Sequence, residues 1–183
     1  MAPDKMQGTA PLSRKQNLLV STLGEGTLIL ILAAIAWITH WPFIFASLGP
    51  TAYEQVELPR SRSSRPYNII TGHLVALGSG FFMLWVLNAW DSPNILALGY
   101  VSWPRLWASA IAAALTAGLT QLLYASQPAS LATSLLVTLG LMQTARDAIA
   151  IIIGVLILTA VGEPMRRLLA KHPPLAKNQP VVN

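Results

Sequence analysis

Residues 47–52, Ser-Leu-Gly-Pro-Thr-Ala, interrupt an apolar run that is long enough to cross a membrane. A second interruption, residues 126–133, reads Ser-Gln-Pro-Ala-Ser-Leu-Ala-Thr and also separates two apolar runs. Lipid offers no hydrogen-bond partners to a broken backbone, so such breaks persist only where they are buried in protein or line a cavity. Two breaks at corresponding positions of a repeated membrane fold indicate a substrate site.

The composition is that of an integral membrane protein. Of the 183 residues, 54% are hydrophobic and 10% are charged, whereas soluble domains have about 25% charged residues. The net charge of +5 comes mostly from basic residues that flank apolar spans, so we expect no nucleic-acid partner. The chain has no cysteine, which excludes disulfides and cysteine-ligated metals.

Four stretches have the length of a membrane span, which needs about 20 apolar residues. They are residues 27–46, 68–89, 106–123 and 148–161. Residues 129–142 are too short to cross comfortably, and they form either a re-entrant half-helix or a short, tilted fifth span. We therefore predict an all-α membrane protein with four transmembrane helices plus short re-entrant or half-length helices.

The expected organisation is a polar tail, a membrane domain and a basic tail, covering residues 1–26, 27–165 and 166–183. Within the membrane domain each half has a long span, a small-residue break, a short segment, a charged turn and another span. This order indicates an internal two-fold repeat. The richness of membrane proteins in Ala, Leu and Gly, however, also produces weak self-similarity by chance.

Lysine and arginine set the expected orientation. Four crossings place both tails and Arg105 on one side, which we predict to be the cytoplasmic side of a bacterial inner (plasma) membrane. The opposite side then holds Arg60, Arg62, Arg65 and Arg146. That is a poor match to the positive-inside rule, and an anionic ligand would explain it.

Both breaks read as helix starts. Proline is favoured at the first helical position, so Gly49-Pro50-Thr51 would direct free amides into the break, and residues 127–130, Gln-Pro-Ala-Ser, repeat the arrangement. Free amides at a helix N-terminus attract anions. An ordinary proline-initiated helix explains either break alone equally well, whereas two matched breaks favour an anion site.

Polar residues inside or beside the spans are the remaining candidates. His73 lies within the second span, where an ionisable residue suggests function and can take up a proton near neutral pH. The alternative is a neutral histidine bonded to a neighbouring helix. The predicted substrate-binding residues are Gly49, Pro50, Thr51, Asn68, His73, Gln127, Ser130 and Thr133.

Arg65 and Arg146 each open a span and form the predicted anion funnel. The alternative for either arginine is an ion pair with Glu54, Glu57 or Asp147. Hydrolytic and redox motifs, P-loops and dinucleotide fingerprints are absent, and the three histidines lie far apart in the sequence. We therefore expect no enzyme activity, no catalytic residue, no metal and no cofactor.

Several of these motifs resemble the HPP family of small integral membrane proteins. They are Ser47-Leu-Gly-Pro-Thr-Ala, Arg65-Pro-Tyr-Asn68, Gly72-His73-Leu74 and the stretch from Gln127 to Leu141. The resemblance covers roughly residues 28–158 and implies four transmembrane segments. Because cyanobacterial and chloroplast members are linked to nitrite transport, it also implies a small monovalent anion as substrate.

One departure from the family concerns the His-Pro-Pro that names it. Gln127-Pro128-Ala129 stands at that position here, and a His172-Pro173-Pro174 in the tail reads as coincidence. Glutamine forms hydrogen bonds but cannot take up a proton. Any difference in substrate or coupling is therefore expected at Gln127.

The sequence thus predicts a carrier or channel for a small inorganic anion such as nitrite, with the two broken-helix N-termini forming the site. The alternative is a non-transporting scaffold or assembly subunit whose breaks serve only close packing. Four spans bury little protein around a polar cavity, so we expect a homo-oligomer in the lipid bilayer.

Overall fold

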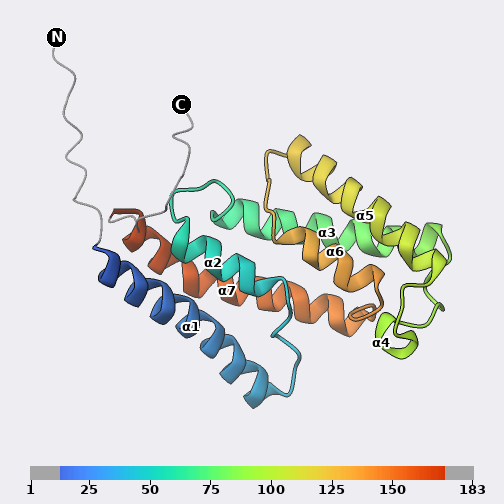
Figure 1. The fold of residues 1–183 in the computed structure, drawn as a ribbon, viewed down its shortest axis with the longest axis horizontal. Helices are drawn as coiled ribbons and strands as arrows, with labels where there is room; N and C mark the ends of the chain where they lie inside the picture. Colours follow the sequence, from blue (N-terminus) through green and yellow to red (C-terminus); the bar gives the residue numbers. More distant parts are fainter. Residues whose placement is uncertain (1–12, 172–183) are drawn as a thin grey trace, which may run out of the picture.

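The computed structural model describes residues 13–171, which form seven helices and no strand, so the all-α expectation is confirmed for them. The helices are α1 (Arg14–Thr39), α2 (Leu48–Glu57), α3 (Pro66–Val86), α4 (Ile95–Leu98), α5 (Trp103–Leu122), α6 (Ser130–Thr138) and α7 (Ala145–Lys171) (Figure 1). The order long, short, long occurs twice, first in α1, α2 and α3, and then in α5, α6 and α7.

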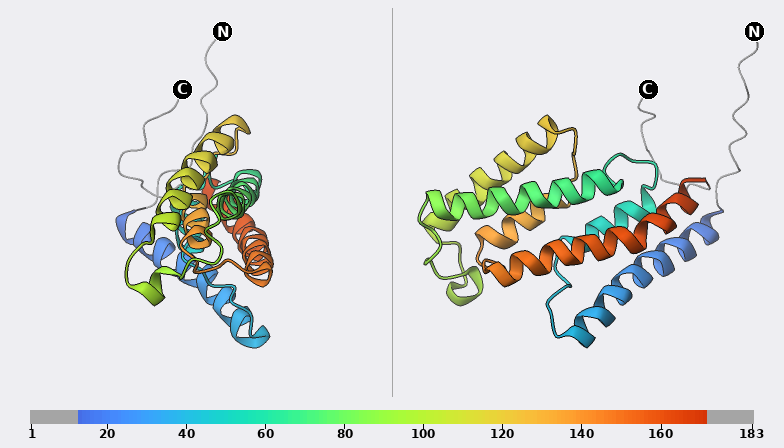
Figure 2. Two further views of the ribbon diagram at one scale, coloured as in Figure 1. Left: turned by 90° about the vertical axis from the view of Figure 1, so that its right-hand side faces the viewer. Right: turned by 180° about the vertical axis from the view of Figure 1, so that it is seen from behind.

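The two triplets run in opposite directions. Helices α1 and α3 run one way along the bundle, and α5 and α7 run the other way (Figures 1 and 2). The short helices α2 and α6 begin near the middle of the bundle and extend toward opposite ends (Figure 1). Both breaks therefore lie at mid-depth, and residues 129–142 contain a half-length helix.

Three helices of the described part are long and apolar enough to cross a membrane, namely α1, α3 and α7. The expectation of four spans is met for these three. Helix α5 has 20 residues, the length of a span, but polar residues such as Arg105, Thr120 and Gln121 lower its hydropathy. The first span also ends earlier than expected, since His40 adopts φ 53° and Pro42 follows it.

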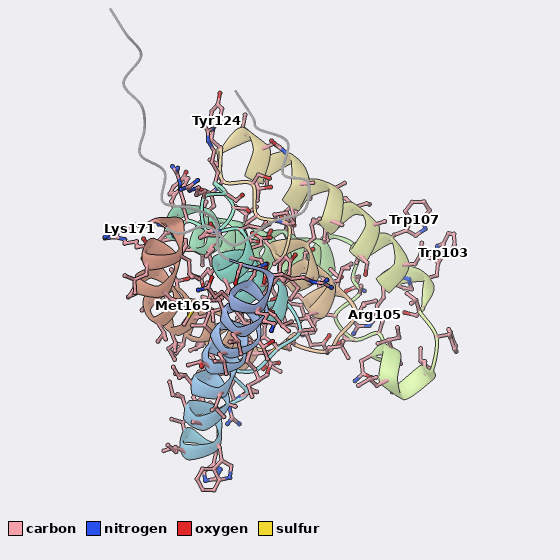
Figure 3. All side chains as sticks on the ribbon, turned by 60° about the vertical axis from the view of Figure 1, so that its left-hand side comes forward. Trp103, Arg105, Trp107, Tyr124, Met165 and Lys171 are labelled. Atoms are coloured by element: carbon pink, nitrogen blue, oxygen red, sulfur yellow. The ribbon has the colours of Figure 1, made fainter. Side chains whose placement is uncertain are left out.

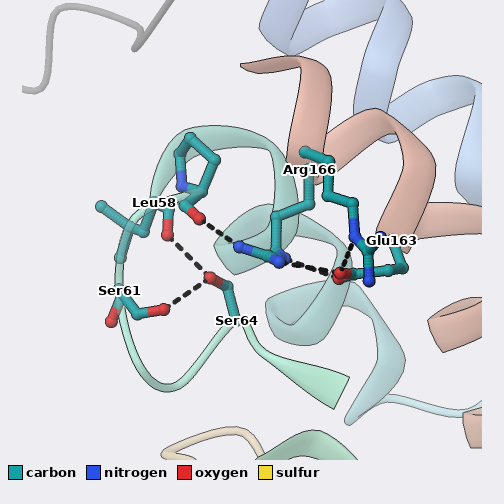
Figure 4. A network of polar contacts seen from close by, with 7 residues as sticks. Leu58, Ser61, Ser64, Glu163 and Arg166 are labelled. Carbon is teal, nitrogen blue, oxygen red and sulfur yellow. Dashed lines mark hydrogen bonds and ion pairs between the residues drawn. The ribbon is translucent and has the colours of Figure 1, made fainter. Parts of the chain in front are cut away.

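The expected orientation of Arg60, Arg62 and Arg65 is wrong. Their loop lies at the end of the bundle where α1 begins and α7 ends, because Arg60 Nε donates to the Ala170 carbonyl at 3.0 Å. Arg166 of α7 in turn donates to the Pro59 carbonyl at 2.8 Å (Figure 4). The arginines lie at this end because residues 40–57 return the chain to the end where α1 begins, although they contain only a half-length helix.

The expected position of Arg105 beside the tails is also wrong, because it lies at the other end, near the start of α7. Its side chain is fully buried, whereas Trp103 and Trp107 project outward from α5 (Figure 3). The guanidinium donates to the Thr138 carbonyl at 2.7 Å, to the Pro93 carbonyl at 2.8 Å and to Gln143 Oε1 at 2.8 Å. A cation at the last carbonyls of α6 is favoured by the helix dipole, so Arg105 fixes the end of that helix.

Glycines let the short helices approach the long ones from the opposite triplet. A Cβ on Gly72 of α3 would lie 2.8 Å from Gln127 Cβ, and one on Gly154 of α7 would lie 2.9 Å from Phe45 Cε1. Gly80 packs in the same way on Val137, and Gly162 on Gln55. The two pairs of contacts are related by a constant offset of 82 positions in the sequence. This offset separates Gly72 from Gly154, Gly80 from Gly162, Phe45 from Gln127, and Gln55 from Val137.

The apolar core lies between these crossed helices. It includes Leu48 and Val56 of α2, Ile69 and Leu84 of α3, Val137 of α6, and Ile151 and Leu158 of α7. Helix α1 contributes only a narrow stripe of buried residues, Gly24, Leu28 and Leu32. The two breaks are therefore enclosed by α2, α3, α6 and α7, with α1 at the periphery.

Candidate functional site

The two breaks meet at a single histidine. His73 of α3 is 1% exposed, and its Nε2 lies 3.1 Å from Thr51 Oγ1 of α2. Its Nδ1 lies 2.7 Å from Thr133 Oγ1 of α6. A third contact joins the breaks directly, because Ser47 Oγ lies 2.7 Å from Thr133 Oγ1. We call Ser47, Thr51, His73 and Thr133 the break cluster.

For a neutral His73, donor and acceptor counting gives the direction of these bonds. The Thr51 hydroxyl donates to the Ser47 carbonyl at 2.9 Å, so His73 Nε2–H donates to Thr51. A neutral imidazole has one donor and one acceptor nitrogen. Nδ1 therefore accepts from the Thr133 hydroxyl, which accepts in turn from the Ser47 hydroxyl. With a neutral His73, each hydroxyl and ring proton of the break cluster is used once.

Helix α3 also positions the second break. Asn68 lies one turn before Gly72, and its Nδ2 donates to the Ser126 carbonyl at 3.1 Å and to the Tyr124 carbonyl at 3.4 Å. At Gly72 the missing side chain makes room for Gln127 and Ser130. The start of α6 is therefore held against the helix that carries His73.

A further link joins the breaks one turn along α2. Gln127 is 2% exposed and Glu54 is 6% exposed. Gln127 Nε2 donates to Glu54 Oε2 at 3.4 Å, while Gln127 Oε1 accepts from the Ser130 amide at 3.1 Å. The amide of Gln127 thus spans the gap between α2 and α6, with one hydrogen bond to each.

The family model described as HPP, transmembrane region, matches residues 10–174, which is most of the chain. This chain belongs to the HPP family. No curated protein and no solved structure matches it. The resemblance seen in the sequence motifs is therefore confirmed at the level of the family, and this HPP protein is a membrane protein.

The break cluster of this HPP protein contains three of the predicted site residues, and three more lie next to it. His73 bonds both Thr51 and Thr133. Gln127 and Ser130 lie in the second break, and Asn68 of α3 is bonded to it. Gly49 and Pro50 are exposed. They lie on the opposite face of α2 from the bonded Thr51.

The predicted funnel arginines lie at opposite ends of the bundle, and both are exposed. Arg65 precedes α3 beside the loop that follows α2. Arg146 places its guanidinium 5.0 Å from the Trp41 ring centroid and donates to the His40 carbonyl at 3.4 Å. Within residues 13–171 the ion pairs of arginine belong to Glu163, so neither funnel arginine is paired with Glu54, Glu57 or Asp147.

Four backbone amides at the breaks are bonded within the protein and so are not free for the expected anion cage. Helix α2 begins at Leu48, two residues before Pro50, and the Leu48 amide donates to the Phe45 carbonyl at 3.0 Å. At the start of α6 the amides of residues 130–132 donate to the carbonyls of residues 127–129. Hydroxyls and an imidazole are therefore the groups that face one another at mid-depth.

Two residues of the site were not among the predicted ones, Ser47 and Glu54. Together with Thr51 they lie at positions i, i+4 and i+7, which face the same side of a helix. That spacing is visible in the sequence, but only the observed helix bounds show that all three lie within or just before α2.

A small cavity reaches the break cluster from the side. Its volume is about 140 Å³, and it lies between α3 and α7 beside His73. The rest of its lining is apolar, formed by Ile70, Leu74, Leu77, Ile151, Ile152, Val155 and Leu156. The described residues contain no group of three His, Asp or Glu side chains placed to hold a metal ion.

Proposed function

We propose that this HPP protein moves a small inorganic monoanion across the membrane, with nitrite as the first candidate, and that the anion binds at the break cluster. The observation that carries the proposal is the position of His73, whose two ring nitrogens contact Thr51 of one broken helix and Thr133 of the other. Broken helices that meet at mid-depth are the usual setting of a transporter site.

The chemistry of the break cluster suits weak, reversible anion binding. Its hydroxyl and imidazole protons are donors, and an entering anion would accept them in place of the acceptors that they now have within the cluster. No lysine or arginine of the described residues bonds to the break cluster. Transport needs binding that is favourable enough to enter and weak enough to leave, and neutral donors meet that need.

The two triplets further suggest an inverted internal repeat. The constant offset of 82 positions relates the glycine contacts of α3 to those of α7, and it also relates Thr51 to Thr133. In this arrangement α5 corresponds to α1 and is the fourth crossing. Inverted repeats place the substrate site at their interface and let one repeat move against the other.

The partner of the peripheral helix α1 is proposed to be a second copy of the chain within the bilayer. Its outward side chains are large and apolar, including Leu18, Leu19, Leu23, Leu30 and Trp37. We further propose that the end of the bundle holding Arg14 and Lys171 faces the cytoplasm of a bacterial cell, since the arginines of the loop after α2 also lie there.

The scaffold alternative has one observation in its favour. Every hydroxyl of the break cluster already has a partner inside the protein, as a purely structural junction would require. The two functions differ in what happens when a hydroxyl is replaced by a methyl group. A structural junction loses stability, whereas a transport site loses flux as well.

Nitrite uptake into proteoliposomes tests the proposal. A hydrogen bond to a charged partner contributes about 1.5–3 kcal/mol, so Thr51→Val and Thr133→Val should each lower uptake about tenfold or more. Thr116→Val is the matched control, because the buried Thr116 hydroxyl bonds only to its own helix, at 2.7 Å from the Ala112 carbonyl.

The outcomes test separately whether the protein transports an anion and whether the anion binds at the break cluster. Wild-type uptake at the rate of empty vesicles, tested also with nitrate and formate, would reject transport and leave the scaffold. Uptake in Thr133→Val equal to that in Thr116→Val would reject the break cluster as the binding site.

A further inference from the structure

Glu54 of α2 is a buried carboxylate at the end of a polar row that begins at Ser47, just before the helix. Ser47, Thr51 and Glu54 follow one another at one-turn spacing, and each contacts a residue of another helix or break. Among the buried polar side chains of residues 13–171, Glu54 is the one acidic group. Acidic groups inside a membrane are rare and usually functional.

The Glu54 carboxylate has neutral partners. Gln127 Nε2 donates to it at 3.4 Å, and the half-exposed Ser63 hydroxyl of the following loop interacts with it. The arginine ion pairs of the described part belong to Glu163, which Arg166 and Arg167 contact at 2.6 Å. A buried charge without an opposite charge nearby is costly.

The helices packed on α2 carry few other titratable groups near this row. Helix α1 contributes Glu25, and Glu57 of α2 itself accepts a bond from Ser21 of α1. Helix α3 contributes His73, and α7 contributes Glu163 with its two arginines. Arg60 of the loop after α2 is bonded to the Ala170 carbonyl. The carboxyl group of Glu54 is thus the titratable group that links Gln127 to this loop.

An anion at the break cluster would lie close to Glu54. Thr51 and Glu54 are three residues apart on α2, and side chains at this spacing are neighbours, about 5–6 Å apart at their Cβ atoms. Two negative charges at such a distance in a low-dielectric interior repel strongly. Protonation of Glu54 removes one of the two charges, so binding of the anion and binding of a proton favour each other.

We propose that Glu54 carries a proton that is cotransported with the anion, one proton for each monoanion, so that no net charge moves. This inference rests on the proposed function. Gln127 holds the carboxyl group beside the anion, and Ser63 connects it to the end of the bundle that bears both termini of the described chain. His73 is a less suitable carrier, because both of its ring nitrogens are already engaged, by Thr51 and Thr133.

The pH dependence of nitrite binding to the purified full chain tests this role. If only protein with protonated Glu54 binds nitrite, the apparent affinity for nitrite falls with the fraction of protein in which Glu54 is protonated. In the wild type it should therefore fall about tenfold per pH unit once Glu54 is mostly ionised. Glu54→Gln should abolish this fall and the proton uptake that accompanies nitrite uptake in proteoliposomes.

Glu57→Gln is the matched control, since Glu57 lies one turn further along α2, is half-exposed and lies outside the polar row. It should keep the wild-type pH dependence. If Glu54→Gln does not yield folded protein, Glu54→Asp retains a titratable group and should keep proton coupling at a lower rate.

The results distinguish the two proposals. Wild-type protein that takes up nitrite without protons, or Glu54→Gln with an unchanged pH dependence, would overturn the role of Glu54 alone. A Glu54→Asp variant that takes up nitrite without protons would do the same. Wild-type protein that moves no anion at any pH would instead overturn the proposed function.

Discussion

Replacing Gly72 by alanine tests the close approach of α3 to the second break. A Cβ at this position would lie 2.8 Å from Gln127 Cβ and 3.4 Å from Ser130 Cβ. Because both neighbours are anchored in the break, α6 or α3 must shift to admit the methyl group. We expect the Gly72→Ala protein to be less stable and to bind nitrite more weakly.

Gly78 of the same helix is the matched control, since nothing lies within 4 Å of a Cβ built there. Alanine in a helix interior gains about 1 kcal/mol over glycine, and both variants share this gain. Overpacking costs about 1–3 kcal/mol and affects Gly72→Ala alone. The two variants should therefore differ by about 1–3 kcal/mol, which corresponds to about 2–12 °C in melting temperature.

Thermal unfolding of the detergent-purified proteins, followed by tryptophan fluorescence, measures this difference. Gly78→Ala should melt slightly above the wild type, and Gly72→Ala at or below it. Equal melting temperatures for the two variants would show that α3 does not pack closely on Gln127 and Ser130.

Three further predictions concern Gly140, Asn68 and Arg146. Gly140 and Gly99 both have a positive φ, 81° and 72° respectively, so alanine is strained at either position. Only at Gly140 would the added Cβ also lie 2.6 Å from Arg105 Cζ. Gly140→Ala should therefore have a lower melting temperature than Gly99→Ala. Asn68→Leu removes both bonds to the second break and should cost about 1–3 kcal/mol in unfolding free energy. Arg146→Gln should leave the melting temperature nearly unchanged and lower nitrite uptake at low salt, and high salt should remove the deficit.

The sequence was most informative where polar residues interrupt apolar runs. Hydroxyls and a histidine inside a bilayer must find partners, so the sequence alone predicts that Thr51, His73 and Thr133 lie together. Their hydrogen-bonded contact now supports that expectation. Whether they bind an anion stays a prediction.

Topology was less predictable, for a physical reason. The return of the chain through residues 40–57 uses an extended segment and a ten-residue helix rather than a long apolar helix. Counting apolar spans cannot detect such a crossing, and this placed Arg60, Arg62 and Arg65 at the wrong end. Arg105 was missed because its acceptors come from three separate segments that meet only in the folded chain.

The central claim is that an anion binds beside His73. Solid-state nitrogen NMR of histidine-labelled protein in lipid tests it most directly, with the Nδ1 and Nε2 signals assigned by His73→Gln. Nitrite should shift the His73 signals in a saturable way and leave those of the exposed His40 unchanged. His73 signals that do not move at nitrite concentrations that saturate uptake would contradict it.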